Sequence, residues 1–213
     1  VLAKQFRATS WIDDIREHEC TVTNLLGVMN DFVLRQPAKN TDTDNELRIV
    51  SAVPVTNETL ENLRTRFAIP KFNELFGMTE CNLPVVRPLD APDEAGCSGK
   101  VWDEYFEVII ADPETDEELP RNEVGEILVR PKEPYCFMAG YNDMPERTVD
   151  TWRNFWFHTG DAGRMDDRGY LWYIDRIKDT IRRRGENISS FEVEAVFLDH
   201  EAVKECAAVA VKA

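Results

Sequence analysis

Several features that would assign the chain at once to a class of protein are missing from its sequence. Its five cysteines are scattered and odd in number, and none form a Cys-x-x-Cys pair, which argues against a disulfide framework and a zinc site. No apolar run approaches the ~20 residues of a membrane span, and no signal-peptide pattern occurs. The formal net charge of −15 disfavours nucleic acid and anionic membranes as partners. We therefore expect reduced thiols and a cytoplasmic protein.

What is present is enough apolar sequence for a core, since apolar residues make up 43% of the 213 residues. The first part of the chain alternates between the hydrophobic periodicity of strands and that of helices. Strand patterns at 47–53 and 71–76 flank a helical pattern at 56–67, and helices are also expected at 11–19 and 25–35. Ser10 is expected to cap the first of them. This alternation predicts a mainly parallel sheet covered by helices, the α/β class.

The pattern changes near Pro84, after which Pro, Gly and Asp turns separate strand patterns, most clearly at 105–111 and 125–130. This segment predicts a β-rich, barrel-like subdomain. Ser189 is expected to cap a last helix. The buried face of that helix is expected to consist of Val193, Val196, Phe197 and His200.

A hairpin near the end of this segment carries the first candidate site. Strands are expected at 162–165 and 170–174, joined by a turn at 166–169 with the Asp and Gly residues that reverse a chain. Such a hairpin brings its ends together, so Asp161 and Arg176 can project toward one point. A carboxylate accepts two hydroxyl hydrogen bonds, as a ribose offers, and a guanidinium is a forked donor to hydroxyls or phosphate. Taken singly, the two residues also fit an ordinary turn and a surface ion pair.

A second candidate site lies at 76–80, directly after a strand pattern. Phe76 can stack on a flat base, and Gly77 lets another group approach the backbone closely. Thr79 offers a hydroxyl to phosphate, and Glu80 is a hard oxygen ligand suited to Mg²⁺. By itself the segment also fits the start of a helix.

Four sequence segments in order resemble the adenylate-forming family, which includes acyl-CoA synthetases, adenylation domains of peptide synthetases, and luciferases. They are His-Thr-Gly-Asp at 158–161, Asp-Arg-Ile-Lys-Asp-Thr-Ile at 175–181, Gly-Glu-Asn-Ile-Ser at 185–189 and Glu-Val-Glu at 192–194. The stretch 181–194 is most similar to CoA ligases of the carnitine/crotonobetaine type. Within the first segment, His158 is expected to be structural rather than catalytic.

The resemblance implies a set of nucleotide-binding residues. The segment at 76–80 would bind adenine and phosphates, with Glu80 touching Mg²⁺, and Asp161 and Arg176 would bind the ribose, Arg176 also reaching phosphate. A small-residue segment would cover the other face of the adenine. The implied ATP- or AMP-binding residues are Ala52, Val53, Pro54, Phe76, Gly77, Met78, Thr79, Asp161 and Arg176.

The resemblance also implies moving parts and a CoA path. Lys178 would be the hinge of a C-terminal lid, although a solvated lysine is the simpler interpretation. Gly185 would let a pantetheine arm pass, and Arg184, in the basic run 182–184, would meet CoA phosphates. The alternative for Gly185 is a glycine required by a turn, and the alternative for Arg184 is a solvated basic surface.

The implied fold is the C-terminal half of a large N-terminal domain, α/β at 1–88 and β-rich at 89–177, followed by the beginning of an α+β lid at 178–213. The resemblance begins past the family's Ser/Thr/Gly-rich phosphate loop and acyl-pocket aromatic, and ends before its catalytic lysine. The sequence contains neither that loop nor a Pro-Lys-x-x-x-Gly-Lys pattern. We therefore expect weak turnover from these 213 residues alone.

The implied reaction joins a small carboxylic acid to ATP, releasing pyrophosphate, and then transfers the acyl group from acyl-AMP to CoA. ATP, Mg²⁺ and CoA would be the cofactors, and a homo-oligomer is compatible with the sequence. Three alternatives remain open: an adenylation domain that loads a carrier protein, a non-catalytic AMP- or ATP-binding module, and an acidic interaction domain. The sequence leaves the acid and the acceptor open.

Overall fold

The computed structural model describes residues 2–53, 55–91, 94–178, 181–183, 186–188, 190–198, 200, 202–203 and 206–209. The chain divides into two compact units, the first made of Val1–Leu75 with Arg87–Ser98 and the second of Phe76–Val86 with Gly99–Ala213. The domain limits at 88 and 177 stay predictions.

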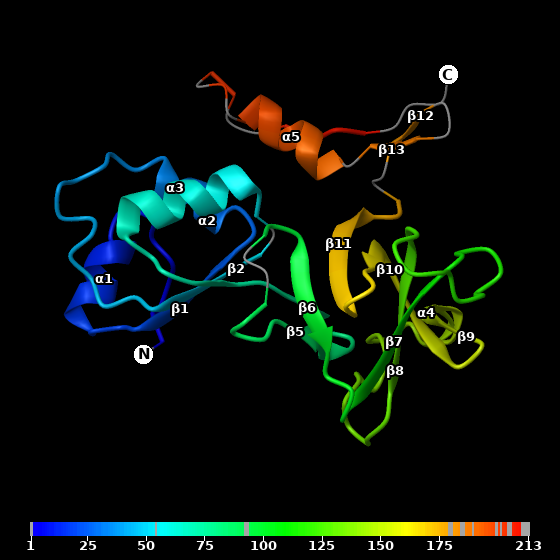
Figure 1. Cartoon of the computed structure of the whole chain (residues 1–213). Coiled ribbons are helices and arrows are strands. Elements are labelled where there is room, and N and C mark those ends of the chain that lie inside the picture. The colour runs from blue at the N-terminus through cyan, green and yellow to red at the C-terminus, as the bar shows by residue number, and fades with distance from the viewer. Residues whose placement is uncertain are drawn as a thin grey trace. The chain divides into compact units, whose positions relative to one another are not determined.

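The first unit contains a parallel sheet with helices, as the alternating sequence pattern predicted (Figure 1). Its strand order is β1-β2-β3, and the pairs β1–β2 and β2–β3 are both parallel. The strands are β1 (Val22–Leu26), β2 (Ile49–Val53) and β3 (Phe72–Asn73), and the helices are α1 (Trp11–Glu17), α2 (Met29–Leu34) and α3 (Asn57–Phe67).

Helix α3 forms where the sequence supplies both a cap and an apolar stripe. The Thr56 side chain accepts a hydrogen bond from the Thr59 N–H (3.1 Å), which satisfies one of the free donors of the first turn. Leu60, Leu63 and Phe67 recur at helical spacing and are buried in the core of the unit. The Phe67 ring meets the edge of Trp11 from α1 at a centroid distance of 5.1 Å, so these helices share one core.

Three expectations for this unit were wrong in detail. The predicted helix at 25–35 begins only at Met29, because Leu25 is a fully buried residue of β1 and Gly27 turns the chain at φ +54°. Ser10 makes no capping bond to the backbone, since its hydroxyl donates to Asp14 instead. The strand expected at 71–76 is split into β3 and β4 (Leu75–Met78), with the buried Glu74 between them accepting the Gly96 N–H.

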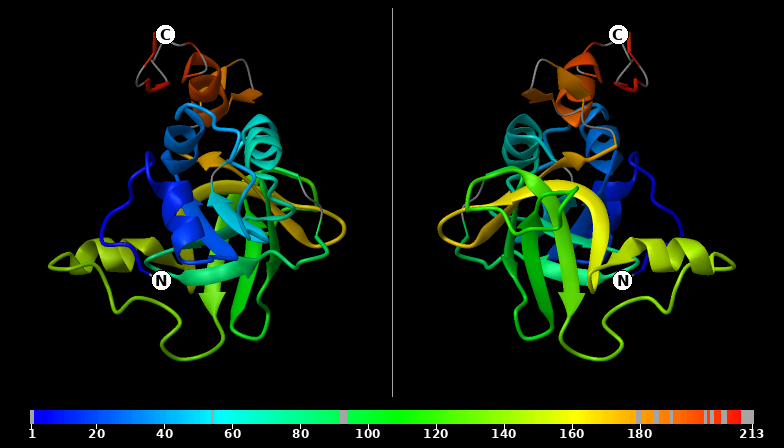
Figure 2. Two further views of the ribbon diagram at one scale, coloured as in Figure 1. Left: turned by 90° about the vertical axis from the view of Figure 1, so that its left-hand side faces the viewer. Right: turned by 90° about the vertical axis from the view of Figure 1, so that its right-hand side faces the viewer.

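The second unit is built on an eight-stranded sheet of order β4-β5-β6-β11-β10-β8-β7, with β9 paired to β10. Among the described strands β4 and β7 stand at the two ends, so the barrel-like subdomain is corrected to an open sheet. Its central strands are strongly curved (Figure 2). Besides β4, the strands are β5 (Asn82–Val86), β6 (Cys97–Val101), β7 (Phe106–Ala111), β8 (Gly125–Pro131), β9 (Trp152–Arg153), β10 (Trp156–Met165) and β11 (Tyr170–Arg176), and a short helix α4 (Pro145–Thr151) precedes β9.

The hairpin β10–β11 forms where the turn chemistry predicted it. The Asp166 carboxylate accepts hydrogen bonds from the N–H groups of Arg168 and Tyr170, both at 2.9 Å, and from Trp172 Nε1 at 3.2 Å. Burial alone would raise the pKa of Asp166, but these bonds and the Arg168 guanidinium hold it below its ordinary value. The turn is therefore fixed by one side chain, and β10 extends back to Trp156, beyond the predicted start of the strand at 162.

The C-terminal part comprises a short hairpin, β12 (Ile181–Arg183) with β13 (Glu186–Ile188), and helix α5 (Ser190–Leu198). The predicted buried face of this helix was wrong, because Val196 is 76% and Phe197 59% exposed. The predicted cap Ser189 lies outside the described residues. Within the described part of the chain, no helix has the length and apolar character needed to cross a bilayer.

Candidate functional site

The two ends of the β10–β11 hairpin meet as predicted. Asp161 and Arg176 are register partners, and Arg176 Nε lies 3.0 Å from Asp161 Oδ1. The carboxylate is buried, with 5% of its side chain exposed, whereas 58% of the Arg176 side chain is exposed. The Nε–H does not point along a hydrogen bond, so Asp161 Oδ1 accepts none from the described residues. This oxygen is a buried acceptor that lacks a hydrogen bond among the described residues, which is rare in folded proteins.

Asp161 occupies its place because β10 is bulged just before it. The register between β10 and β8 shifts between His158 and Ala162, and Gly160 adopts φ +73°, a conformation that favours glycine. The Thr159 hydroxyl donates to the Ile127 carbonyl (2.7 Å) and accepts the Asp161 N–H (3.1 Å). Bulges of this kind change the direction of a side chain. The four residues His-Thr-Gly-Asp at 158–161 therefore act together to place the Asp161 carboxylate.

The electrostatic environment opposes ionisation of Asp161. Burial raises the pKa of its carboxyl, the Arg176 charge lowers it, and the charges of Glu126, Asp175 and Glu80 raise it; together they bring it to about 6. These acidic groups come from β8, from β11 and from the turn after β4. The structure therefore brings the predicted residue Glu80 into the electrostatic range of Asp161.

The segment 76–80 forms the end of β4 and the turn into β5. Phe76 is only 5% exposed, and its ring stacks against Tyr173 of β11 at a centroid distance of 6.3 Å. The ring is thus a core residue in this structure, and its stacking on adenine stays a prediction. Met78 is half-buried and Thr79 is exposed.

The Glu80 carboxylate accepts the Tyr141 hydroxyl at 3.2 Å, while its carbonyl accepts the Met138 N–H at 2.8 Å. Among the described residues, no three His, Cys, Asp or Glu side chains gather as a metal-binding group. Next to Glu80, Cys81 is fully buried, and burial, together with the charges of Glu80 and Asp161, raises the pKa of its thiol to about 12.

Gly77 is required by the β4–β5 hairpin itself. A Cβ added there would overlap the Asn82 carbonyl oxygen and lie 2.7 Å from Leu83 Cδ2. We expect Gly77→Ala to destabilise the second unit by about 1–3 kcal/mol, the usual cost of overpacking, even without a ligand. Urea unfolding compared with Gly169→Ala, where a Cβ meets nothing within 4 Å but φ is +79°, separates packing from backbone strain. Equal stability of Gly77→Ala and the parent chain would contradict the packing role.

The remaining predicted site residues are less informative. Ala52 and Val53 end strand β2 in the first unit, the former buried and the latter half-buried, so their role at an adenine face stays a prediction. Lys178 is exposed in the turn after β11, which is compatible with both a hinge and a solvated lysine. Pro54, Arg184 and Gly185 lie outside the described residues.

Glu126 was not among the residues predicted for the site. Its Oε1 accepts the Gly160 N–H at 3.0 Å, and its Oε2 lies 3.0 Å from His158 Nδ1. The available signal was an acidic residue inside the otherwise apolar strand pattern at 125–129, where a buried charge requires partners. His158, expected to be structural, is 9% exposed at its side chain and is held by this carboxylate.

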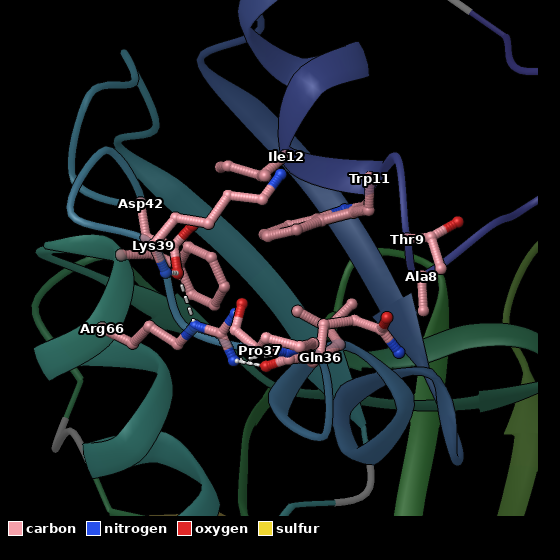
Figure 3. A pocket seen from close by; sticks show the side chains of 11 residues that line it. Ala8, Thr9, Trp11, Ile12, Gln36, Pro37, Lys39, Asp42 and Arg66 are labelled. Carbon is pink, nitrogen blue, oxygen red and sulfur yellow. Dashed lines mark hydrogen bonds and ion pairs between the residues drawn. The ribbon is translucent and has the colours of Figure 1, made fainter.

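A small cavity in the first unit is lined by Trp11, Asp42, Arg66 and Phe67 among others (Figure 3). Its volume of about 20 Å³ has room for one water, far below the several hundred Å³ of a ligand pocket. Arg66 reaches across it to Asp42 Oδ2 (2.7 Å) and to the carbonyls of Leu34, Gln36 and Pro37 at 2.8–3.1 Å. This cluster therefore ties α3 to the end of α2 and is a structural element of the unit.

Comparison with known proteins identifies the family. The model of the AMP-binding enzyme family matches residues 1–142. Over the whole chain the sequence is 30% identical to 4-coumarate–CoA ligase 1 of Glycine max, covering 74% of that protein. It is 29% identical to crotonobetaine/carnitine–CoA ligase of Salmonella heidelberg, covering 41% of that one.

A solved structure supports the same assignment. O-succinylbenzoate coenzyme A synthetase of Bacillus subtilis, in complex with ATP and magnesium ion, has a TM-score of 0.74 and 28% identity. The match covers 97% of this chain and 42% of that one, so the chain spans less than half of that enzyme. The ordered segments, the hairpin geometry and these likenesses together establish that the chain belongs to the AMP-binding, adenylate-forming enzyme family.

Proposed function

We propose that the chain supplies the ribose side of the nucleotide site of an ATP-dependent acyl-CoA ligase. The observation that carries the proposal is the pair at the hairpin ends: a buried Asp161 whose Oδ1 accepts no hydrogen bond from the described residues, beside the exposed Arg176 guanidinium. The two hydroxyls of a ribose fit the carboxylate, and the guanidinium can reach the ribose or a phosphate. The likeness to CoA ligases favours this ligand over other sugars.

The proposed reaction has two steps. A carboxylate attacks the α-phosphate of ATP, giving acyl-AMP and pyrophosphate, and the thiol of CoA then displaces AMP. Thr79, exposed in the turn after β4, is suited to bind a phosphate oxygen. Mg²⁺ is commonly held by one or two carboxylates plus substrate phosphates, so Glu80 alone is a fitting protein ligand. When bound, the ion neutralises phosphate charge.

The other proposed residues act on adenine, on the lid and on CoA. Ala52, Val53, Pro54, Phe76, Gly77 and Met78 would surround the adenine, Lys178 would be the hinge of a lid, and Gly185 with Arg184 would line the CoA path. An adenylation domain that loads a carrier protein remains an alternative acceptor assignment, and a non-catalytic nucleotide-binding module remains an alternative function. Exchange of pyrophosphate with ATP separates the non-catalytic module from the two enzymes, and thioester formation with CoA or with a carrier protein separates those two.

The decisive experiment is AMP binding by the parent chain and by Asp161→Ala, measured by calorimetry. Loss of the paired hydroxyl contacts is expected to cost about 1–3 kcal/mol of binding free energy. Asp167→Ala, an exposed acidic residue of the same hairpin, is the matched control and should bind AMP as the parent does. Unchanged affinity in Asp161→Ala would rule out the ribose role.

A further inference from the structure

We infer that Glu126 is a positioning residue of the nucleotide site, because its carboxylate holds the bulge and the imidazole that together place Asp161. The inference rests on the proposed function for its biological meaning, but its geometry stands independently. Glu126 lies on β8, the strand next to β10, and is itself buried, with 7% of its side chain exposed.

Glu126 supports the bulge of β10. Where the β10–β8 register shifts, the backbone between His158 and Ala162 loses its ladder partners on β8. Gly160 N–H donates to Glu126 Oε1 at 3.0 Å, and its carbonyl accepts the Ile177 N–H at 2.8 Å. Buried N–H groups need a partner, so the Glu126 carboxylate replaces a missing backbone acceptor at the residue before Asp161.

Glu126 also contacts His158. Glu126 Oε2 lies 3.0 Å from its Nδ1, and Arg153 Nε donates toward its Nε2 at 3.4 Å. Arg153 Nη2 also lies 3.1 Å from His158 Nδ1. The Glu126 carboxylate and the Arg153 guanidinium thus hold the orientation of the imidazole from both sides.

The network continues beyond His158 to the surface. Asp116 Oδ2 lies 3.7 Å from His158 Nε2, and the same carboxylate accepts from Arg153 (2.9 Å) and Asn154 (2.7 Å). The polar contacts therefore run from the half-exposed Arg153 through His158 and Glu126 to the residue before Asp161. Because both oxygens of the Glu126 carboxylate are engaged, the group cannot rotate without breaking its contact to Gly160 or to His158.

Glu126 also acts on Asp161 through its charge. The charged and titratable groups that act on Asp161 are Arg176 and Asp175 from β11, Glu126 from β8 and Glu80 from the turn after β4, with the thiol of Cys81 beside them. The Glu126 charge raises the pKa of Asp161. Its removal should lower that pKa, whereas loss of a purely structural contact elsewhere in the sheet would leave it in place.

The test uses two substitutions with different expected effects. Glu126→Gln keeps an oxygen for the Gly160 N–H but removes the charge, so the Gly160 amide should stay protected while the pKa of Asp161 falls. Glu126→Ala removes both, so exchange of the Gly160 amide should accelerate at least tenfold and AMP affinity should fall about tenfold. Glu107→Gln is the control, since Glu107 lies on the neighbouring strand β7, is half-exposed, and pairs with Arg130 of β8.

The readouts are the ¹³C carboxyl titration of Asp161, hydrogen exchange of the Gly160 amide, and AMP titration, each by NMR on the full chain. Unchanged Gly160 exchange in Glu126→Ala, or an Asp161 titration that is the same in the parent and in Glu126→Gln, would overturn the inference. If the parent chain binds no AMP, the proposed function fails while the first two readouts still decide the role of Glu126. If Glu126→Ala does not fold, Glu126→Gln decides it through the titration.

Discussion

Asp161→Asn is expected to stabilise the second unit at pH 7 by up to about 3 kcal/mol. The folded structure raises the pKa of this carboxyl from 3.8 to about 6, and each pKa unit corresponds to about 1.36 kcal/mol. The charged form is therefore disfavoured in the folded state, and asparagine keeps the shape without the charge. Arg176 loses a partner, but its side chain is 58% exposed and remains hydrated.

The sign of the pH dependence follows from the raised pKa. Between about pH 4 and 6 the folded state holds more protons than the unfolded state, so the contribution of Asp161 to stability falls as the pH rises through this window. Above about pH 6 the destabilisation caused by the charged Asp161 is constant. The stability advantage of Asp161→Asn should therefore be largest at pH 7 and should vanish near pH 3.5.

Urea unfolding followed by amide signals of β10 and β11, at several pH values, measures this difference. Asp167→Asn removes the same charge from an exposed position of the hairpin turn and should change stability by less than about 0.5 kcal/mol. A variant less stable than the parent at pH 7 would show that the carboxylate is satisfied in the folded chain. Asp161→Asn is thus expected to gain stability and lose AMP affinity. This is the trade-off found where function needs a residue that destabilises the fold.

Arg66→Met is expected to destabilise the first unit by about 3–5 kcal/mol. The substitution keeps much of the apolar stem but leaves Asp42 buried, with 3% of its side chain exposed and without its ion-pair partner. It also removes the donor from three backbone carbonyls at and after the end of α2. Such carbonyls have no partner within the helix, so they depend on side chains or water.

Urea unfolding followed by signals of α2 and α3 measures the effect. Arg48→Met replaces an exposed arginine of the same unit and should cost less than about 1 kcal/mol. Adding Asp42→Asn to Arg66→Met should recover part of the loss, because the buried charge is then gone. Equal losses in the two single arginine variants would mean that Arg66 contributes no more than a surface residue.

The acid dependence of this cluster has the opposite sign to that of Asp161. Burial by itself would raise the pKa of Asp42, but the Lys39 N–H, the Arg66 bonds and the charges of Arg66 and Arg16 lower it below its ordinary value. Its contribution to stability is therefore present above about pH 4. It is lost as the pH falls further, through the lowered pKa, and the parent and Arg66→Met should converge there.

The parts of the site predicted from sequence are those governed by local chemistry. The turn at 166–169 fixes its own hairpin through Asp166, and a hairpin of known length sets which residues stand opposite, so the Asp161–Arg176 pair followed from spacing. The prediction of a helix at 25–35 was wrong because apolar residues at Leu25 and Val28 fit a helical period, even though Leu25 is the buried residue of strand β1.

Glu126 was beyond reach because its role depends on pairing between strands distant in the sequence. A register shift between β8 and β10 is what leaves the Gly160 N–H in need of an acceptor. No local pattern encodes that shift, although the acid within an apolar strand indicated that some partner exists.

The buried thiol of Cys81 makes opening of the turn between β4 and β5 measurable. With a pKa of about 12, only about 10⁻⁵ of the thiol is ionised at pH 7, and the side chain is enclosed, so alkylating reagents cannot modify it in the closed fold. In a variant that keeps Cys81 as its sole cysteine, the rate at which the thiol is alkylated therefore measures how often the β4–β5 turn opens. A nucleotide that binds this turn should lower the alkylation rate of Cys81. The nucleotide concentration at which the rate is halved then gives the binding affinity, without any measurement of turnover.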